Sequence, residues 1–174
     1  MGILKNNLIL REATEADAAV ILDIQECVVA ELDYLITAPE EFNKTVEEQQ
    51  EWIHKVIQSE RETIVAAEID GAVVGWIAFQ TSSRSRLAHT GSIGMMIKPS
   101  FRNRGIGKAL IMYILDWAAE NPLIEKVCLG VLSTNERAIR LYEGLGFVEE
   151  GRKVKDIKFS EDRYADDVLM YKFV

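Results

Sequence analysis

The stretch from residue 87 to residue 132 restricts the possible folds most, because it encodes a strand, a helix and a second strand in succession. Residues 87–99 (LAHTGSIGMMIKP) are typical of a strand ending at Pro99, which has no N–H for a sheet ladder. Residues 105–121 have helical apolar spacing, and residues 124–132 (IEKVCLGVL) again predict a strand. Two strands joined by a helix are expected to run parallel in one sheet.

The remaining segments predict antiparallel strands and three more helices. Asp70-Gly71 divides residues 63–82 into a hairpin, and Thr45 with Glu48 forms a capping box. Thr14 and Asp17 resemble a shorter capping box. We expect strands at 8–13, 147–157 and 164–174 and helices at 14–32, 45–59 and 135–146. The expected order β-α-α-β-β-β-α-β-α-β-β predicts an α/β (α+β) fold, with a mixed, mostly antiparallel sheet and helices on both faces.

Size and composition limit the class of protein. The chain of 174 residues is expected to form one domain over residues 1–174. A net charge of −8 argues against a nucleic-acid partner, and no apolar run is long enough for a membrane span. We predict neither a signal peptide nor N-myristoylation, and expect a cytoplasmic protein in which Cys27 and Cys128 are free packing thiols. Two His and two Cys without ligand spacing predict no metal.

Residues 102–110 (RNRGIGKAL) place two glycines and three cations where a helix begins. The first turn of a helix has free N–H groups and about half a positive charge. We therefore predict bound phosphate, with Gly105 and Gly107 letting it approach the backbone and Arg102, Arg104 and Lys108 adding charge. The alternative is that the glycines only relieve strain in a tight turn.

Charge is distributed unevenly along the chain. Residues 71–115 contain six bases and no acid, whereas residues 11–62 contain fourteen acids and four bases. This indicates an anionic ligand at the middle segment and a cationic partner near the first, unless the acidic helices are simply solvated. A Walker loop is excluded because Arg102 and Ala109 replace its Gly and Ser/Thr, and a dinucleotide fingerprint because Leu110 replaces its third glycine.

Two segments together resemble one known family. Arg102-x-x-Gly105-x-Gly107 is similar to the [RQ]-x-x-G-x-[GA] loop with which GNAT acetyltransferases bind the acetyl-CoA pyrophosphate. Residues 135–147 (NERAIRLYEGLGF) resemble the family segment N-x-x-A-x-x-L-Y-x-x-x-G-F. The resemblance extends over essentially the whole chain. It implies a single N-acetyltransferase domain with the GNAT fold, in which the parallel strand pair splays apart.

The resemblance also implies a cofactor site. Pantetheine is expected to pair with the strand around Met95–Ile97, in the manner of an added strand. Gly91 and Gly94 in the same strand either mark a bulge that opens the gap between the parallel strands or relieve local packing. Tyr142 is the expected general acid toward the thiolate, against the alternative of a core tyrosine. The full set implied for acetyl-CoA is Met95, Met96, Ile97, Arg102, Asn103, Arg104, Gly105, Ile106, Gly107, Lys108, Asn135, Ala138 and Tyr142.

The base that deprotonates the acceptor is not fixed by the sequence. Many family members carry a Glu on the strand before the glycine turn, but residues 89–97 contain none. Glu26, Glu31, Asp33 and His89 are the candidates, although surface acids are usually solvated and a lone His is usually structural. Backbone N–H groups of Met96 or Ile97 are expected to stabilise the oxyanion.

The resulting functional hypothesis is transfer of acetyl from acetyl-CoA to a primary amine of a small metabolite or amino acid, by direct attack in a ternary complex. The acidic first segment suits a cationic amine. A ribosomal-type protein N-terminus is the alternative acceptor, and a non-catalytic acyl-CoA sensor is a third possibility that Tyr142 argues against. A homodimer is compatible with the resemblance.

Overall fold

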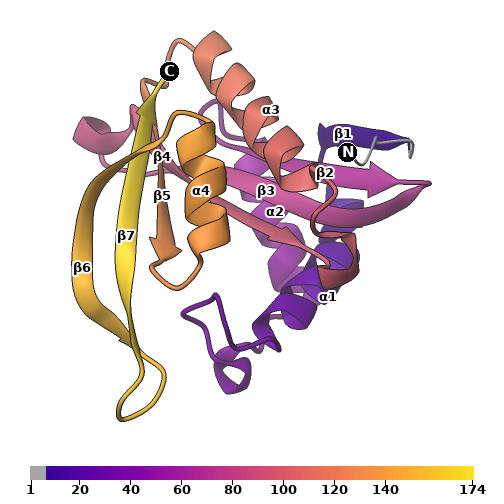
Figure 1. Cartoon of the computed structure of the whole chain (residues 1–174). Helices are drawn as coiled ribbons and strands as arrows, with labels where there is room; N and C mark the ends of the chain where they lie inside the picture. The colour runs from indigo at the N-terminus through magenta and orange to yellow at the C-terminus, as the bar shows by residue number, and fades with distance from the viewer. Residues whose placement is uncertain (1–6) are drawn as a thin grey trace.

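The computed structural model describes residues 7–174, which form one layered α/β unit (Figure 1). Residues 1–6, where the predictions on signal peptide and myristoylation begin, lie outside the described residues. In chain order the strands and α-helices are β1 (Leu8–Glu12), α1 (Ala18–Val29), α2 (Val46–Ile57), β2 (Thr63–Ile69), β3 (Ala72–Thr81), β4 (Thr90–Ile97), α3 (Ile106–Glu120), β5 (Lys126–Leu132), α4 (Glu136–Gly144), β6 (Val148–Lys158) and β7 (Tyr164–Phe173).

The described strands form one seven-stranded sheet in the order β1-β2-β3-β4-β5-β7-β6. β4 and β5 pair in parallel, and the other neighbours pair antiparallel. The predicted order of elements and the mixed sheet are therefore confirmed. The hairpin turn at Asp70-Gly71 is confirmed as well, because both residues have the positive φ, 50° and 81°, that a two-residue turn of this kind requires.

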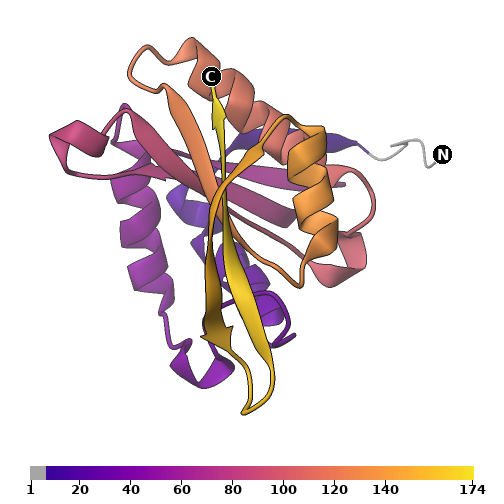
Figure 2. The same ribbon diagram turned by 60° about the vertical axis from the view of Figure 1, so that its left-hand side comes forward.

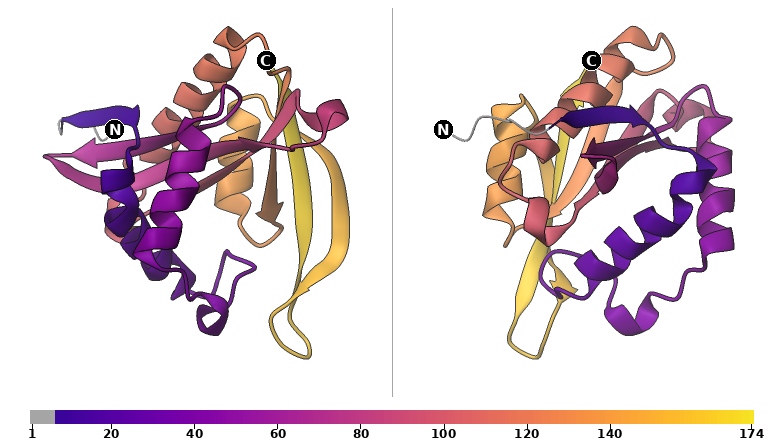
Figure 3. Two further views of the ribbon diagram at one scale, coloured as in Figure 1. Left: turned by 180° about the vertical axis from the view of Figure 1, so that it is seen from behind. Right: turned by 90° about the vertical axis from the view of Figure 1, so that its right-hand side faces the viewer.

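The sheet separates two apolar layers, since successive strand residues point to opposite faces. On β2, Val65 and Ala67 face the layer under α3 and α4, whereas Ile64 and Ala66 face the layer under α1 and α2. Figure 3 shows α1 and α2 on one face of the sheet and α3 and α4 on the other. The prediction of helices on both faces is confirmed.

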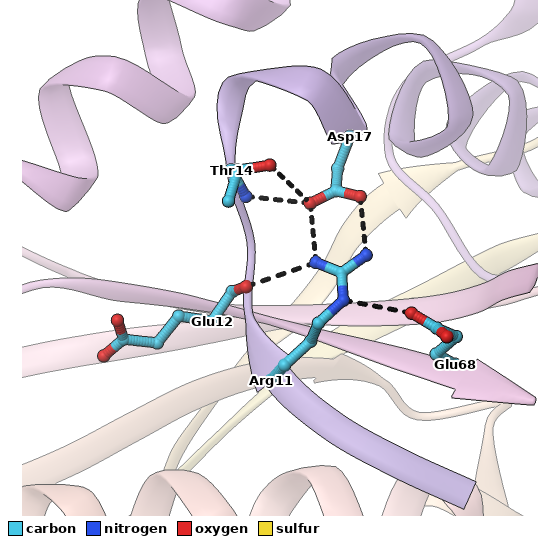
Figure 4. A network of polar contacts seen from close by, with 5 residues as sticks. All are labelled: Arg11, Glu12, Thr14, Asp17 and Glu68. Carbon is cyan, nitrogen blue, oxygen red and sulfur yellow. Dashed lines mark hydrogen bonds and ion pairs between the residues drawn. The ribbon is translucent and has the colours of Figure 1, made fainter. Parts of the chain in front are cut away.

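A partly buried ion pair fixes the junction between β1 and α1 (Figure 4). The Arg11 guanidinium donates to both Asp17 carboxylate oxygens at 2.8 Å and to Glu68 at 3.0 Å. The Thr14 N–H donates to the same Asp17 carboxylate at 2.8 Å, as the short capping box predicted. The hydrogen bonds from Arg11 hold the pKa of the Asp17 carboxyl below its usual range.

Asp17→Asn is expected to lower the free energy of unfolding by about 1.5 kcal/mol near neutral pH, because it removes a charged hydrogen-bond partner of Arg11, which is partly exposed to solvent and keeps Glu68. The pKa of Asp17 is lowered in the folded state, so its contribution is complete above about pH 4 and is lost as the pH falls through the folded pKa. Urea unfolding at pH 6 and pH 3 measures this. The difference between wild type and variant should shrink at pH 3, whereas Glu149→Gln, in an exposed pair with Arg152, should change little at either pH.

The expectation of a bulge at Gly91 and Gly94 needs correction. The β3–β4 register is continuous from Gly75↔Ile97 to Thr81↔Gly91, so Gly91 and Gly94 mark no bulge. A Cβ atom at Gly91 would lie 2.7 Å from the Gln80 carbonyl oxygen, and the packing alternative therefore holds for Gly91.

The two cysteines are both free, as expected, but only Cys128 is half-buried. Cys27 lies exposed on α1, because the apolar face of that helix is turned away from it. Within the described part of the chain, every helix is too short or too polar to cross a membrane.

Candidate active site

The parallel pair β4–β5 separates after three residues. Thr90, Gly91 and Ser92 pair with Lys126, Val127 and Cys128, and from there the strands diverge (Figure 1). Each strand keeps its other neighbour over its whole length, β3 for β4 and β7 for β5. The facing edges beyond Ser92 and Cys128 therefore carry backbone groups without sheet partners, into which an extended amide-containing ligand can bind.

The glycine turn begins where β4 ends. The Lys98 N–H donates to the Val74 carbonyl oxygen at 2.9 Å and anchors the start of the turn to β3. Asn103 and Gly105 both have positive φ, 64° and 80°, and α3 begins at Ile106. Among the described residues no side chain caps this helix start, so the amides of its first turn lack a capping side chain; that an anion binds them stays a prediction.

The two glycines of the turn have different surroundings. Gly105 is exposed, and its φ of 80° is a conformation that favours glycine. Gly107 is buried, and a Cβ atom there would lie 3.3 Å from Met95 Cε and 3.4 Å from Ile97 Cδ1. Gly107 therefore allows α3 to pack closely on β4. That a glycine opens the backbone to the ligand stays a prediction, and the exposure of Gly105 favours it at that position.

The three cations of the turn also differ. Arg104 is exposed, with its guanidinium over the Phe101 ring at 5.0 Å, and Lys108 is exposed on the first turn of α3. Arg102 instead makes a bidentate ion pair with Glu31, at 2.9 and 2.6 Å, and its Nε donates to the Ile97 carbonyl oxygen at 3.2 Å. Sequence reasoning missed this pair, for which the only signal was the opposite charge of the two segments.

Helix α4 carries the second part of the site. The Asn135 side-chain oxygen accepts from the Ala138 N–H at 3.2 Å and caps the helix. Two turns later the Tyr142 ring packs edge-on against Phe147, with the centroids 5.8 Å apart. Burial raises the pKa of Tyr142 to about 12, so the phenol holds its proton at neutral pH. A protonated phenol is the form that a general acid needs.

The four base candidates lie in different places. Both carboxylate oxygens of Glu31 are bound by Arg102, and Asp33 lies 3.7 Å from Arg163 in the β6–β7 hairpin. Glu26 is exposed on α1. His89 precedes β4 at the end where the strands are still paired, about 20 Å along the chain from Met95. The geometry therefore separates His89 from the splay.

A hollow of 480 Å³ lies on the outer side of α3. It is bounded by α3 and by the end of β7, and it shares Lys108 with the glycine turn but contains no residue of the splayed part of β4 or β5. The hollow therefore lies apart from the opening between β4 and β5.

Comparison with known proteins identifies the family. The model of the acetyltransferase (GNAT) family matches residues 29–147, which include the splay, the glycine turn and α4. This chain belongs to the GNAT family. A GNAT-family acetyltransferase from Streptococcus pneumoniae has the same fold with a TM-score of 0.91 and 27% identity, over 97% of this chain and 100% of that one. The GNAT acetyltransferase described here is accordingly an acyltransferase.

Two further acetyltransferases are similar to this chain. L-amino acid N-acetyltransferase AaaT of Escherichia coli is 30% identical over 106 residues, which is 61% of this chain and 65% of AaaT. The yncA acetyltransferase of Salmonella typhimurium, whose structure contains acetyl-CoA, shares the fold with a TM-score of 0.86 and 22% identity, over 96% of this chain and 94% of that one.

Proposed function

We propose that this GNAT protein transfers the acetyl group of acetyl-CoA to a primary amine of a small metabolite or amino acid, by direct attack in a ternary complex. The observation that carries the proposal is the unpaired edge of β4 and β5 beside an uncapped helix start. The bound acetyl-CoA of the Salmonella protein and the amino-acid substrate in the name of AaaT support it.

The turn and the splay match the two halves of coenzyme A. In the proposal the diphosphate binds the amides of residues 104–108, and Arg104 and Lys108 add positive charge. The pantetheine arm pairs with the free edge of β4 around Met95, Met96 and Ile97. The Asn135 side-chain oxygen caps α4, so its NH2 group keeps two donors for the pantetheine arm. The small side chain of Ala138 leaves room for the arm beside it.

The residues of the site have separate roles in the displacement of coenzyme A by the amine. The amine nitrogen attacks the thioester carbonyl carbon, the C–S bond breaks, and the backbone N–H of Ile97 stabilises the intermediate oxyanion, because the alternation of the β3–β4 ladder turns the Met96 N–H toward β3. Tyr142 gives its proton to the departing thiolate. The amine loses one proton to a base, for which Glu26, Asp33 or a water chain remain the candidates. The products are an N-acetyl amide and the free thiol of coenzyme A.

The acceptor is proposed to enter from the α1–α2 side, because α3 and α4 cover the other face of the sheet (Figure 3). The loop between α1 and α2 and the β6–β7 hairpin lie at one end of the molecule, joined by the ion pair of Asp33 and Arg163 (Figure 2). The acidic character of residues 31–48 suits a cationic amine.

A protein N-terminus is the second candidate acceptor, and one observation favours it. Leu32, Tyr34 and Ile36 are exposed on the loop after α1, with 60%, 46% and 70% of their surface accessible. Such an apolar rim can hold the side chains of a peptide that follows the reactive amine.

An amine panel tests the proposed function and separates the two acceptors. The protein is incubated with acetyl-CoA and with amino acids, polyamines or short peptides with free N-termini, and the released thiol is measured. We expect release well above the rate without amine for one of the first two classes. Release with peptides alone would assign the second acceptor, and no release with any class would contradict acetyl transfer to amines.

A further inference from the structure

Arg102 and Glu31 join two functional segments that lie 71 residues apart in the sequence. The guanidinium uses Nη1, Nη2 and Nε, three of its five N–H donors, on the two Glu31 oxygens and the Ile97 carbonyl. The two side chains are 23% and 28% exposed, so the pair is partly shielded from solvent. A bidentate pair of this kind fixes geometry as well as charge.

The pair changes what Arg102 can contribute to anion binding. The Nη1 and Nη2 groups of Arg102 already donate to the Glu31 carboxylate, so a phosphate would have to compete with Glu31 for these two donors. The summed charge of the pair is zero, and it adds little to the positive potential of the turn. Arg104 and Lys108 remain the cations of the turn that are exposed.

The other end of the pair lies where α1 stops. Glu31 follows the last residue of the helix cap, and Leu32 after it has a φ of 63°, a left-handed conformation that is costly for leucine. We name residues 31–38 the acceptor-side loop. It carries the exposed side chains of Leu32, Tyr34 and Ile36, and Leu35 is the apolar side chain of this loop that packs against the core under α1 and α2. The ion pairs of Glu31 with Arg102 and of Asp33 with Arg163 tie it to the turn and to the β6–β7 hairpin.

We propose that Arg102 is a positioning residue, which ties the acceptor-side loop to the glycine turn through Glu31, and that it is not a phosphate ligand. The inference rests on the proposed function, which puts the diphosphate on the turn and the acceptor beside this loop. A cofactor that orders the turn then also orders the loop through this pair. Coenzyme A therefore raises the affinity for the acceptor, and the acceptor raises the affinity for coenzyme A by the same factor.

The test uses Glu31→Gln, Arg102→Gln and the double variant, with Glu120→Gln as the matched control. Glu120 is exposed, lies at the end of α3 away from the glycine turn, and makes no ion pair within residues 7–174. Hydrogen exchange over residues 31–38, calorimetric titration with coenzyme A, and KM and kcat for the amine found in the panel are measured. If Arg102→Gln does not fold, the test is repeated with Arg102→Lys, which keeps the positive charge but cannot make the bidentate pair with Glu31.

Each single variant is expected to speed exchange over residues 31–38 about tenfold and to raise the acceptor KM about tenfold, with a smaller change in kcat. The Kd of coenzyme A should change less than threefold, the double variant should match either single variant, and the Glu120 control should match wild type. Exchange that stays at the wild-type rate would overturn the proposal. So would coenzyme A binding that weakens tenfold in Arg102→Gln but tightens in Glu31→Gln.

These results are independent of the amine panel. If no amine reacts, exchange and coenzyme A titration still decide whether Arg102 positions the loop, and the proposed function fails by itself. If wild-type protein does not bind coenzyme A, the proposed cofactor site is wrong. The link between the acceptor-side loop and the glycine turn is then tested by hydrogen exchange alone, and exchange over residues 31–38 at the wild-type rate in the variants would reject it.

Discussion

Tyr142→Phe is expected to lower kcat by a factor of about 100 to 1000, with little change in the Kd of coenzyme A. The phenol is half-buried on α4, and burial keeps its pKa near 12, so wild type holds the proton that the leaving thiolate needs. Phenylalanine keeps the edge-on contact with Phe147 but has no proton to give. Steady-state thiol release and coenzyme A titration provide the two measurements.

Tyr171→Phe is the matched control for this prediction. Tyr171 is a half-buried tyrosine on β7 whose ring packs edge-on against Phe173, with the centroids 5.2 Å apart, and it has no part in the proposed site. Its kcat should stay close to that of wild type. Full turnover in Tyr142→Phe would remove the general-acid role, and with it the main sequence argument against a non-catalytic sensor.

Most of the fold could be predicted because its signals are local. The hairpin at Asp70-Gly71 depends on two adjacent residues that tolerate positive φ, and the α2 start depends on the reciprocal bonds of Thr45 and Glu48, three residues apart. The parallel pair followed from one strand–helix–strand unit, because a single helix that packs on the sheet returns the chain to the edge at which the first strand began.

The site was predicted less completely because several of its contacts join distant segments. Spacing along the chain places Arg102 in the glycine turn. It does not reveal that the end of α1 lies beside this turn in space, where the Glu31 carboxylate accepts from Arg102. The same holds for Gly107, whose neighbours Met95 and Ile97 come from the preceding strand. His89 was placed on β4 by the sequence, yet which end of β4 opens depends on pairing with β5.

The difference between the two glycines decides which variant tests the cofactor site. Valine at Gly107 would meet Met95 and Ile97, so a weaker affinity would mix packing with binding. Gly105 is exposed, and alanine there would place a methyl group at the helix start and strain a backbone with a φ of 80°. Gly105 is therefore the position at which the diphosphate can be tested directly.

Gly105→Ala is expected to weaken coenzyme A binding about 30-fold, which corresponds to the loss of about 2 kcal/mol of charge-assisted hydrogen bonding to the first amides of α3. Gly71→Ala is the control, because Gly71 has a φ of 81° and no atom within 4 Å of the added Cβ. Both variants carry the same backbone strain, so urea unfolding should show similar losses of about 1 kcal/mol. Only Gly105→Ala should alter the calorimetric Kd. Because backbone strain is common to both variants, it cannot by itself make their affinities for coenzyme A differ. Equal affinities for coenzyme A would therefore mean that the diphosphate binds away from the start of α3.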